Sequence, residues 1–309
     1  MKNDSKLSER RKMNNTFIFW SFGQSEQKIS QIKVPSSKRN FPILIMFVVF
    51  LISFNFYSAC RKERFPQPNN NLNKKIGEEV KSVLAKVAEA YGNKRYIIKK
   101  SDIGAAVLYD QKSKRILQTG GGFHESDIKL FLRISQLLPV RSIFIIGNAF
   151  GYSAFCLAEI FQKAFIDVID AEIEGEDNQK GSEITRIIAQ TYYPKVELTI
   201  GFSPQDTPKA VRPVIINEIG GYDLVFIDGM HTNEQIVKDF DGILPFLSPR
   251  CVVAIHDVGL YQMYQGFKLI SEKARKNGFD AFISSVEWTR FGTGLVGRGI
   301  NNLALLRTE

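Results

Sequence analysis

Side chains that bind metals or act as nucleophiles are scarce in this chain. Its 309 residues include only three histidines and three cysteines, the latter at positions 60, 156 and 251. The irregular cysteine spacing excludes a disulfide framework and a zinc-ligand pattern. No internal repeat is evident, and the triple glycine at 120–122 lacks the Lys-Ser/Thr pair that completes a phosphate-binding loop. Because histidines are so few, their places in the sequence are informative.

Net charge is almost absent from most of the chain. Residues 76–309 carry 27 basic and 28 acidic side chains, whereas residues 1–75 carry 14 basic and 4 acidic ones. The formal charge of +9 therefore belongs to the N-terminal quarter. A nearly neutral main region argues against an enzyme that binds nucleic acid through a basic face.

Charged residues are also missing from residues 41–60, FPILIMFVVFLISFNFYSAC. A helix of about 20 apolar residues spans roughly 30 Å of hydrocarbon, and basic pairs flank this segment on both sides. We expect a single membrane-spanning helix here. A basic, disordered tail at residues 1–40 would precede it, and a linker at 61–75 rich in Pro, Asn and charge would follow.

Other interpretations of residues 41–60 remain open. The segment is also compatible with a buried core helix or a cleaved signal, and Cys60 is a candidate for acylation. More basic residues precede the segment than follow it, which favours a cytoplasmic tail. The folded region would then lie on the other side of the membrane, away from a cytosolic cofactor, so the sequence leaves the orientation undecided.

The remaining sequence predicts an N-terminal extension and an α/β domain. The pattern of residues 76–122 predicts an amphipathic helix followed by a β-hairpin. From residue 123 to 309, apolar strands alternate with helices, which predicts a doubly wound, mostly parallel, seven-stranded Rossmann-like sheet. The expected strands include residues 142–146, 165–170 and 196–200, and two further strands lie within the runs 222–231 and 251–257.

Two of these strands end in an acid and a histidine. The run YDLVFIDGMH places Asp228 and His231 after one strand, and CVVAIHD places His256 and Asp257 after the next. An amphipathic helix between the two runs supplies the crossover that parallel strands require. Because ligands bind at the carboxyl ends of such strands, we expect these four side chains to form one polar site.

A glycine loop follows the first strand of the α/β domain. Gly147 and Gly151 bracket Asn148 between a strand and a helix, where glycine permits a tight turn and close approach of a ligand. Asp170 and Glu172 end the next strand, where an acid can accept both hydroxyls of a ribose. Alternatively, these two acids belong to a solvated acidic loop and bind no ribose.

The segments IIGNAFGYSAFCLAEIF, VIDAE and YDLVFIDGMHTNEQIVKDFDGILPFLSPRCVVAIHDV resemble class I S-adenosylmethionine-dependent methyltransferases. The similarity is to the small-molecule O-methyltransferase branch, in which Asp-Gly-x-His ends the fourth strand and His-Asp ends the fifth. It covers residues 124–298. The resemblance implies S-adenosylmethionine as the cofactor and a small hydroxylated molecule or a glycan as the methyl acceptor.

The resemblance also implies roles for individual residues. Gly147 and Gly151 would border the methionine moiety, and Asp170 or Glu172 would bind the ribose. Residues 201–203, with Ser203, would lie near the adenine. Asp228 would face the sulfonium and the acceptor.

Removing the acceptor's proton requires a base. A histidine titrates in a range suited to this work near neutral pH, so we expect His231 or His256 to serve, with Asp228 as the orienting group. In metal-using relatives the strand ends hold magnesium, and the corresponding positions here are Asp228, His256 and Asp257. Magnesium prefers oxygen to imidazole, which argues against a simple magnesium site.

Two departures from the family pattern leave other functions open. Ile145 replaces an acid near the end of the first strand, and Ala149 replaces the middle glycine of the loop. These changes keep open a membrane-attached binding module with weakened catalysis. A nicotinamide-dependent oxidoreductase is disfavoured because the loop lacks the G-x-G-x-x-G pattern. The sequence indicates no oligomeric state.

Overall fold

The computed structural model describes residues 70–100, 106–121, 123–173, 175–283 and 292–300. The chain divides into two compact units, Met1–Arg64 and Phe65–Glu309, and every described residue lies in the second. The predicted tail, the predicted membrane span at 41–60 and most of the predicted linker fall outside these residues. None of the helices in the described ranges is long and apolar enough to cross a bilayer.

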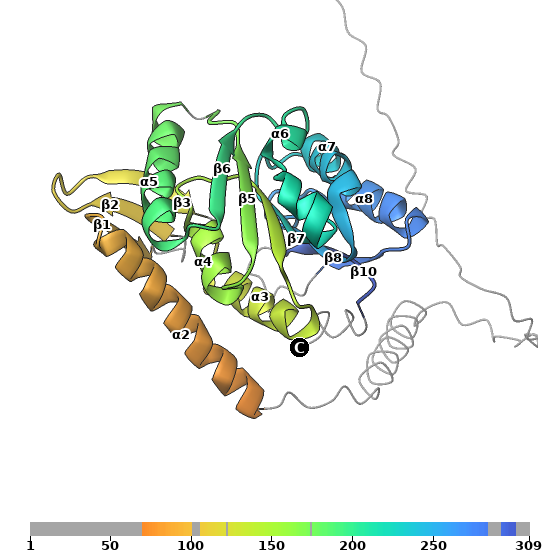
Figure 1. Ribbon diagram of the computed structural model, residues 1–309, viewed down its shortest axis with the longest axis horizontal. Coiled ribbons are helices and arrows are strands. Elements are labelled where there is room, and N and C mark those ends of the chain that lie inside the picture. The colour runs from red at the N-terminus through yellow and green to blue at the C-terminus, as the bar shows by residue number, and fades with distance from the viewer. Residues whose placement is uncertain (1–69, 101–105, 122, 174, 284–291, 301–309) are drawn as a thin grey trace, which may run out of the picture. The chain divides into compact units, whose positions relative to one another are not determined.

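A seven-stranded sheet forms the centre of the second unit (Figure 1). Its spatial order is β6-β5-β4-β7-β8-β10-β9, with β4 to β8 parallel and β10 antiparallel to both neighbours. This arrangement confirms the predicted doubly wound, mostly parallel sheet. The strands are β4 (Ser142–Ile146), β5 (Phe165–Asp170), β6 (Val196–Ile200), β7 (Tyr222–Ile227), β8 (Leu247–Ile255), β9 (Asp280–Ile283) and β10 (Gly294–Arg298).

Helices cover both faces of this sheet, which is why β4 and β7 are buried along their whole length. On one face the core includes residues of α2 (Asn70–Gly92), α3 (Glu125–Leu137), α4 (Tyr152–Ile160) and α5 (Glu176–Tyr192). The core of the other face includes residues of α6 (Thr207–Ala210), α7 (Asn233–Ile243) and α8 (Tyr264–Lys276). Two short turns, Ile215–Ile219 and Leu244–Phe246, complete this layer.

The N-terminal extension consists of α2 and a separate three-stranded antiparallel sheet, β1 (Tyr96–Lys100), β2 (Ala106–Asp110) and β3 (Ile116–Gly121). The β2–β3 hairpin was expected, whereas β1 was not. Helix α2 packs against α3, α4 and β1. Its buried Tyr91 hydroxyl donates a 2.6 Å hydrogen bond to the carbonyl of Phe150 in the glycine loop. The extension is thereby bonded directly to the loop that follows β4.

Several elements differ from the sequence-based expectation. Helix α2 begins at Asn70 rather than near Ile76, because its first turns are polar and show no apolar periodicity. Strand β8 begins at Leu247, four residues before the apolar run, since Pro249 and Arg250 lie exposed at its start. The short α6 and β9 and the amphipathic α8 were not anticipated.

Candidate functional site

The carboxyl ends of four parallel strands are aligned across the sheet. Their last paired residues form one row, Ile169, Ile146, Ile227 and Ile255. Backbone hydrogen bonds continue one step further, because Gly147 donates to the Ile169 carbonyl, Asp228 to that of Ile146 and His256 to that of Ile227. The glycine loop, Asp228 and His256 therefore start side by side at one edge, as the sequence predicts.

Asp228 is the centre of a cluster of polar side chains at this edge. Its Oδ1 lies 3.2 Å from Nε2 of His231 and 3.1 Å from Nδ1 of His256. His256 also lies 3.3 Å from Oδ1 of Asp257 through Nδ1, and 3.3 Å from Oδ2 of Asp127 through Nε2. The structure thus brings the four predicted side chains together and adds Asp127 from α3.

No pattern in the sequence indicates that Asp127 belongs to the site. Asp127 accepts a hydrogen bond from the backbone N–H of His124 at 2.7 Å, the arrangement of a capping box at the start of α3. An acid in the first turn of a helix is usual, so its second contact, with His256, is visible only in three dimensions.

His256 is buried as a cation between carboxylates. Burial alone lowers the pKa of an imidazole, but the charges of Asp228 and Asp127, together with their hydrogen bonds, raise the pKa of His256 well above its usual value. Burial raises the pKa of Asp228. Attraction by His256 and hydrogen bonds from both histidines outweigh this effect and lower that pKa below the ordinary range of a carboxyl group. The pair is therefore an ionised Asp228 beside a protonated His256.

His231 has a different environment. Its side chain is 27% exposed, compared with 2% for His256. The imidazole stacks on the ring of Tyr261, with centroids 4.3 Å apart and an interplanar angle of 4°. Of the two histidines at the strand ends, His231 is the one that a bound molecule can reach.

One group of side chains has the spacing of a metal site. Ligand atoms of Asp228, His231 and Asp257 all lie within 4.8 Å of one another. Oδ1 of Asp257 is buried and has no hydrogen bond to any described group. The structure thus places His231, in place of the expected His256, with the two carboxylates. One imidazole and two carboxylates suit a divalent ion such as manganese better than magnesium.

The glycine loop approaches the backbone of the Asp228 loop very closely. Gly147 has φ of 100°, and a Cβ built on it would lie 2.2 Å from the carbonyl oxygen of Asp228. Gly151 has φ of 86° and would meet Thr185 Oγ1 at 2.7 Å. Ala149 takes a left-handed φ of 47°, so the loop forms although the middle glycine is missing.

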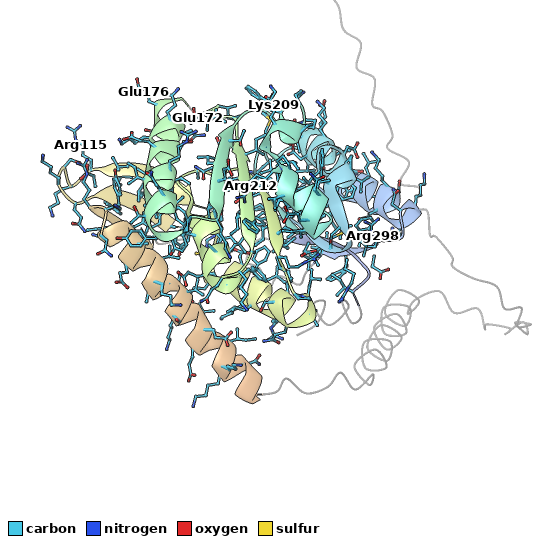
Figure 2. The ribbon with its side chains drawn as sticks, in the orientation of Figure 1. Arg115, Glu172, Glu176, Lys209, Arg212 and Arg298 are labelled. Carbon is cyan, nitrogen blue, oxygen red and sulfur yellow. The ribbon has the colours of Figure 1, made fainter. Side chains whose placement is uncertain are left out.

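The acids after β5 are arranged differently from each other. Both oxygens of Asp170 accept backbone hydrogen bonds, from Asn148 at 2.6 Å and from Glu172 at 2.7 Å. Asp170 thus ties the glycine loop to the end of β5. Glu172 lies half-buried in the loop before Glu176, the first residue of α5 (Figure 2). Within the described ranges its carboxylate has no hydrogen-bond partner, which leaves both oxygens for a ligand.

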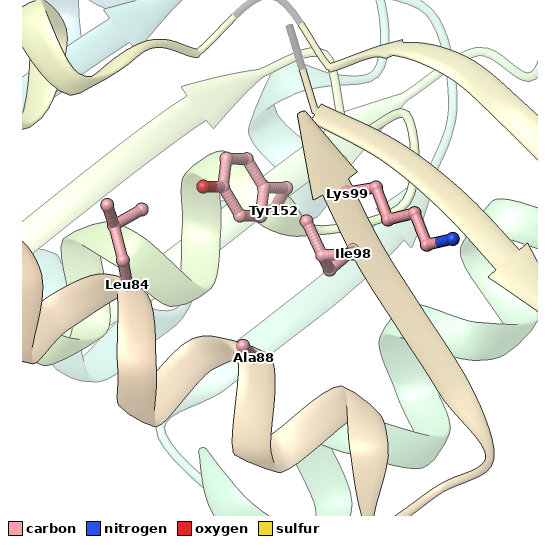
Figure 3. A pocket seen from close by; sticks show the side chains of 5 residues that line it. All are labelled: Leu84, Ala88, Ile98, Lys99 and Tyr152. Atoms are coloured by element: carbon pink, nitrogen blue, oxygen red, sulfur yellow. The ribbon is translucent and has the colours of Figure 1, made fainter. Parts of the chain in front are cut away.

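A small apolar cavity of about 150 Å³ lies where Leu84 and Ala88 of α2 face β1 and the first residue of α4, Tyr152 (Figure 3). Ile98 and Lys99 of β1 complete the lining. The Lys99 ammonium turns away and lies 4.9 Å from the centroid of the Tyr109 ring. The cavity therefore offers apolar volume and no charge.

Comparison with known proteins agrees with this geometry. Residues 144–258 match the family model described as a methyltransferase domain. A 124-residue stretch is 27% identical to the uncharacterized protein y4gI of Sinorhizobium fredii; it covers 39% of this chain and only 13% of that relative's length.

Two solved structures show distant similarity. The O-methyltransferase TomG from Streptomyces achromogenes, in complex with SAM, is 18% identical, with a TM-score of 0.47 over 70% of this chain and 89% of its own. An O-methyltransferase from Bacillus cereus, in complex with SAH, is 15% identical, with a TM-score of 0.42 over 71% and 89%.

The family match falls on the glycine loop and on both strand ends that carry the acid and histidine pairs. The resemblance to class I methyltransferases is therefore confirmed over residues 144–258. The similarity to a methyltransferase domain thus covers strands β5 to β8 of the seven-stranded sheet.

The close approach at Gly147 can be tested with a matched pair of glycines. We expect Gly147→Ala to destabilise the fold by several kcal/mol, because the added Cβ would overlap the Asp228 carbonyl in addition to the strain of positive φ. Gly220→Ala is the control, since Gly220 has φ of 88° but open space around its Cβ position. Urea unfolding measures both, and equal losses would contradict the close approach as the cause.

Proposed function

We propose that the protein is an S-adenosylmethionine-dependent O-methyltransferase that acts on a small hydroxylated molecule or a glycan. The observation that carries this proposal is the reachable His231 imidazole, 3.2 Å from an ionised Asp228 and at the same sheet edge as the glycine loop. The family match supplies the reaction type.

The cofactor would be held by three parts of the strand edge. Gly147 and Gly151 let the backbone approach the methionine moiety closely. The unpaired Glu172 carboxylate is the better ribose ligand, because Asp170 already accepts two backbone hydrogen bonds. Ser203, after β6, would lie beside the adenine. Asn148 shapes the loop through its side-chain hydrogen bond to Thr185 at 3.1 Å.

Methyl transfer is an in-line displacement. S-adenosylmethionine, when bound, would supply the methyl group: the acceptor oxygen would bond to the methyl carbon as the carbon–sulfur bond breaks, and the electron pair of that bond would leave with sulfur. The acceptor hydroxyl must lose its proton, and His231 takes it. With Nε2–H donated to Asp228, the other ring nitrogen, Nδ1, keeps the lone pair of the base.

His256 acts through Asp228 and does not touch the acceptor. Both of its nitrogens face carboxylates, so the imidazolium holds Asp228 ionised and oriented. Neither departure from the family pattern disturbs this arrangement, because Ile145 is fully buried in the core and Ala149 completes the loop. These observations favour an active enzyme over a binding module.

Replacement of the base gives a direct test. We expect His231→Ala to lower the rate of methyl transfer at least 100-fold and to leave the dissociation constant of S-adenosylmethionine within about threefold of the unaltered value, because the imidazole serves the acceptor. Calorimetry and a panel of hydroxylated acceptors measure the two quantities. Lys238→Ala, an exposed change on α7, is the control. An unchanged rate in His231→Ala with cofactor bound would refute the role.

A second candidate mechanism uses a divalent ion at Asp228, His231 and Asp257. The ion would orient and acidify the acceptor hydroxyl. Since a metal-bound imidazole cannot also be the free base, the two mechanisms exclude each other for His231.

Removal of metal separates these mechanisms. If His231 is the base, we expect more than half of the rate to remain after dialysis against EDTA, and Asp257→Asn to change it less than about threefold. Loss of the rate after EDTA, with recovery on addition of manganese or magnesium, would assign the ion in place of the base.

Membrane attachment is a further part of the proposal. Residues 41–60 are uncharged and long enough to span a bilayer. We expect the full chain to stay in the membrane pellet after carbonate extraction, and a chain lacking residues 41–60 to move to the supernatant. Protease protection of the two termini reports the orientation. Release of the full chain by carbonate would contradict a membrane span.

A further inference from the structure

Helix α7 is hydrogen-bonded to and packed against the loop that follows β6, here called the 201–206 loop. The Gln235 side-chain amide donates hydrogen bonds to the Ser203 carbonyl and to Oδ1 of Asp239, each at 2.8 Å. Two turns from Gln235, a Cβ on Gly242 would lie 2.4 Å from Cβ of Pro204. These α7 positions, at i, i+4 and i+7, lie on one face of the helix and define the face that holds the loop.

Asp239 is an unusual residue for this position. It is 1% exposed, and its Oδ2 has no hydrogen-bond partner among the described groups. This oxygen is 4.0 Å from the position that a Cβ on Gly229 would occupy, next to Asp228. The carboxyl group therefore lies between the 201–206 loop and the loop that begins with Asp228.

Burial of this carboxyl group is costly. Burial raises the pKa of Asp239 to about 6, while the side chains of Ser203 and Gln235 and the charge of Lys238 lower it. An apolar side chain would fill the same space without the cost of an unpaired buried oxygen. Stability therefore does not explain an acid at this position, and its polar neighbours are Gln235 and Ser203, which join α7 to the 201–206 loop.

The start of α7 joins the same unit to the site. Thr232 caps the helix, since its hydroxyl accepts a hydrogen bond from the Gln235 N–H at 3.1 Å. His231 directly precedes this cap. One short helix therefore sets the position of His231 at its beginning and of the 201–206 loop along its side.

We propose that Asp239 and Gln235 are positioning residues that hold the 201–206 loop against α7 for binding of the adenosine part of the cofactor. The inference depends on the proposed function, because it assumes that S-adenosylmethionine binds at this edge. In this arrangement, α7 sets the distance between the loop that binds the adenosine part of the cofactor and the end of the site at Asp228, where methyl transfer takes place.

Three variants test this role. Asp239→Leu and Gln235→Ala remove the polar contacts to the loop, and Gly242→Ala pushes on Pro204 without changing a polar group. We expect each to raise the dissociation constant of S-adenosylmethionine at least tenfold, with kcat at saturating cofactor within about twofold. Asp239→Asn keeps an acceptor for Gln235 and should rescue affinity to within about threefold.

Two controls separate position from general damage. Asp241→Asn changes an exposed acid of the same helix that pairs with Lys273, and Gly77→Ala adds a methyl group in open space. Both should bind the cofactor like the unaltered chain. Because Gln235 is only half-buried, its variant keeps the test decisive even where Asp239→Leu does not fold.

The outcomes distinguish this inference from the proposed function. Unchanged cofactor affinity in all three variants refutes the positioning role alone, as does a lower melting temperature with unchanged affinity in the folded variants. Absence of S-adenosylmethionine binding by the unaltered full chain refutes the proposed function and this inference together.

Discussion

The site depends on the register of four parallel strands. Because β5, β4, β7 and β8 end in one row, the residues that follow them are adjacent across the sheet although more than a hundred positions separate the first from the last. The backbone ladder fixes Gly147, Asp228 and His256 before any side-chain contact forms. A shift of one strand by one residue would turn these side chains to the other face.

Charge balance is the second constraint on this edge. Around His256 lie the three carboxylates of Asp127, Asp228 and Asp257, all within 3.3 Å of a ring nitrogen. Removal of one partner of a buried ion pair leaves a charge without compensation, so the pair of His256 and Asp228 depends on both members. The cationic His256 permits Asp228 to stay ionised, and His231 remains the member of the group that is partly exposed to solvent.

Much of this arrangement could be predicted from the sequence. Apolar runs of strand length predicted the five parallel strands. The acids and histidines at the ends of two of these strands predicted the cluster around Asp228. Periodicity could not reveal the polar first turns of α2 or the short β9. Asp127 and Asp239 were missed for another reason. Asp127 lies in the first turn of α3, where acids are common, and Asp239 lies in the polar sequence of α7; only the folded structure shows that the first contacts His256 and that the second is buried. The choice between His231 and His256 likewise required the burial of each ring.

The hydrogen bond from Tyr91 to Phe150 has a consequence for where the folding unit begins. The segment that matches the methyltransferase family starts at residue 144, yet the carbonyl of Phe150 within it is satisfied by a helix more than fifty residues upstream. Excised on its own, the matched segment would lose this partner together with the aromatic contacts of Tyr91 to Phe150 and Phe155. The extension is therefore part of the same folded body, and a boundary drawn from family similarity alone would cut through it.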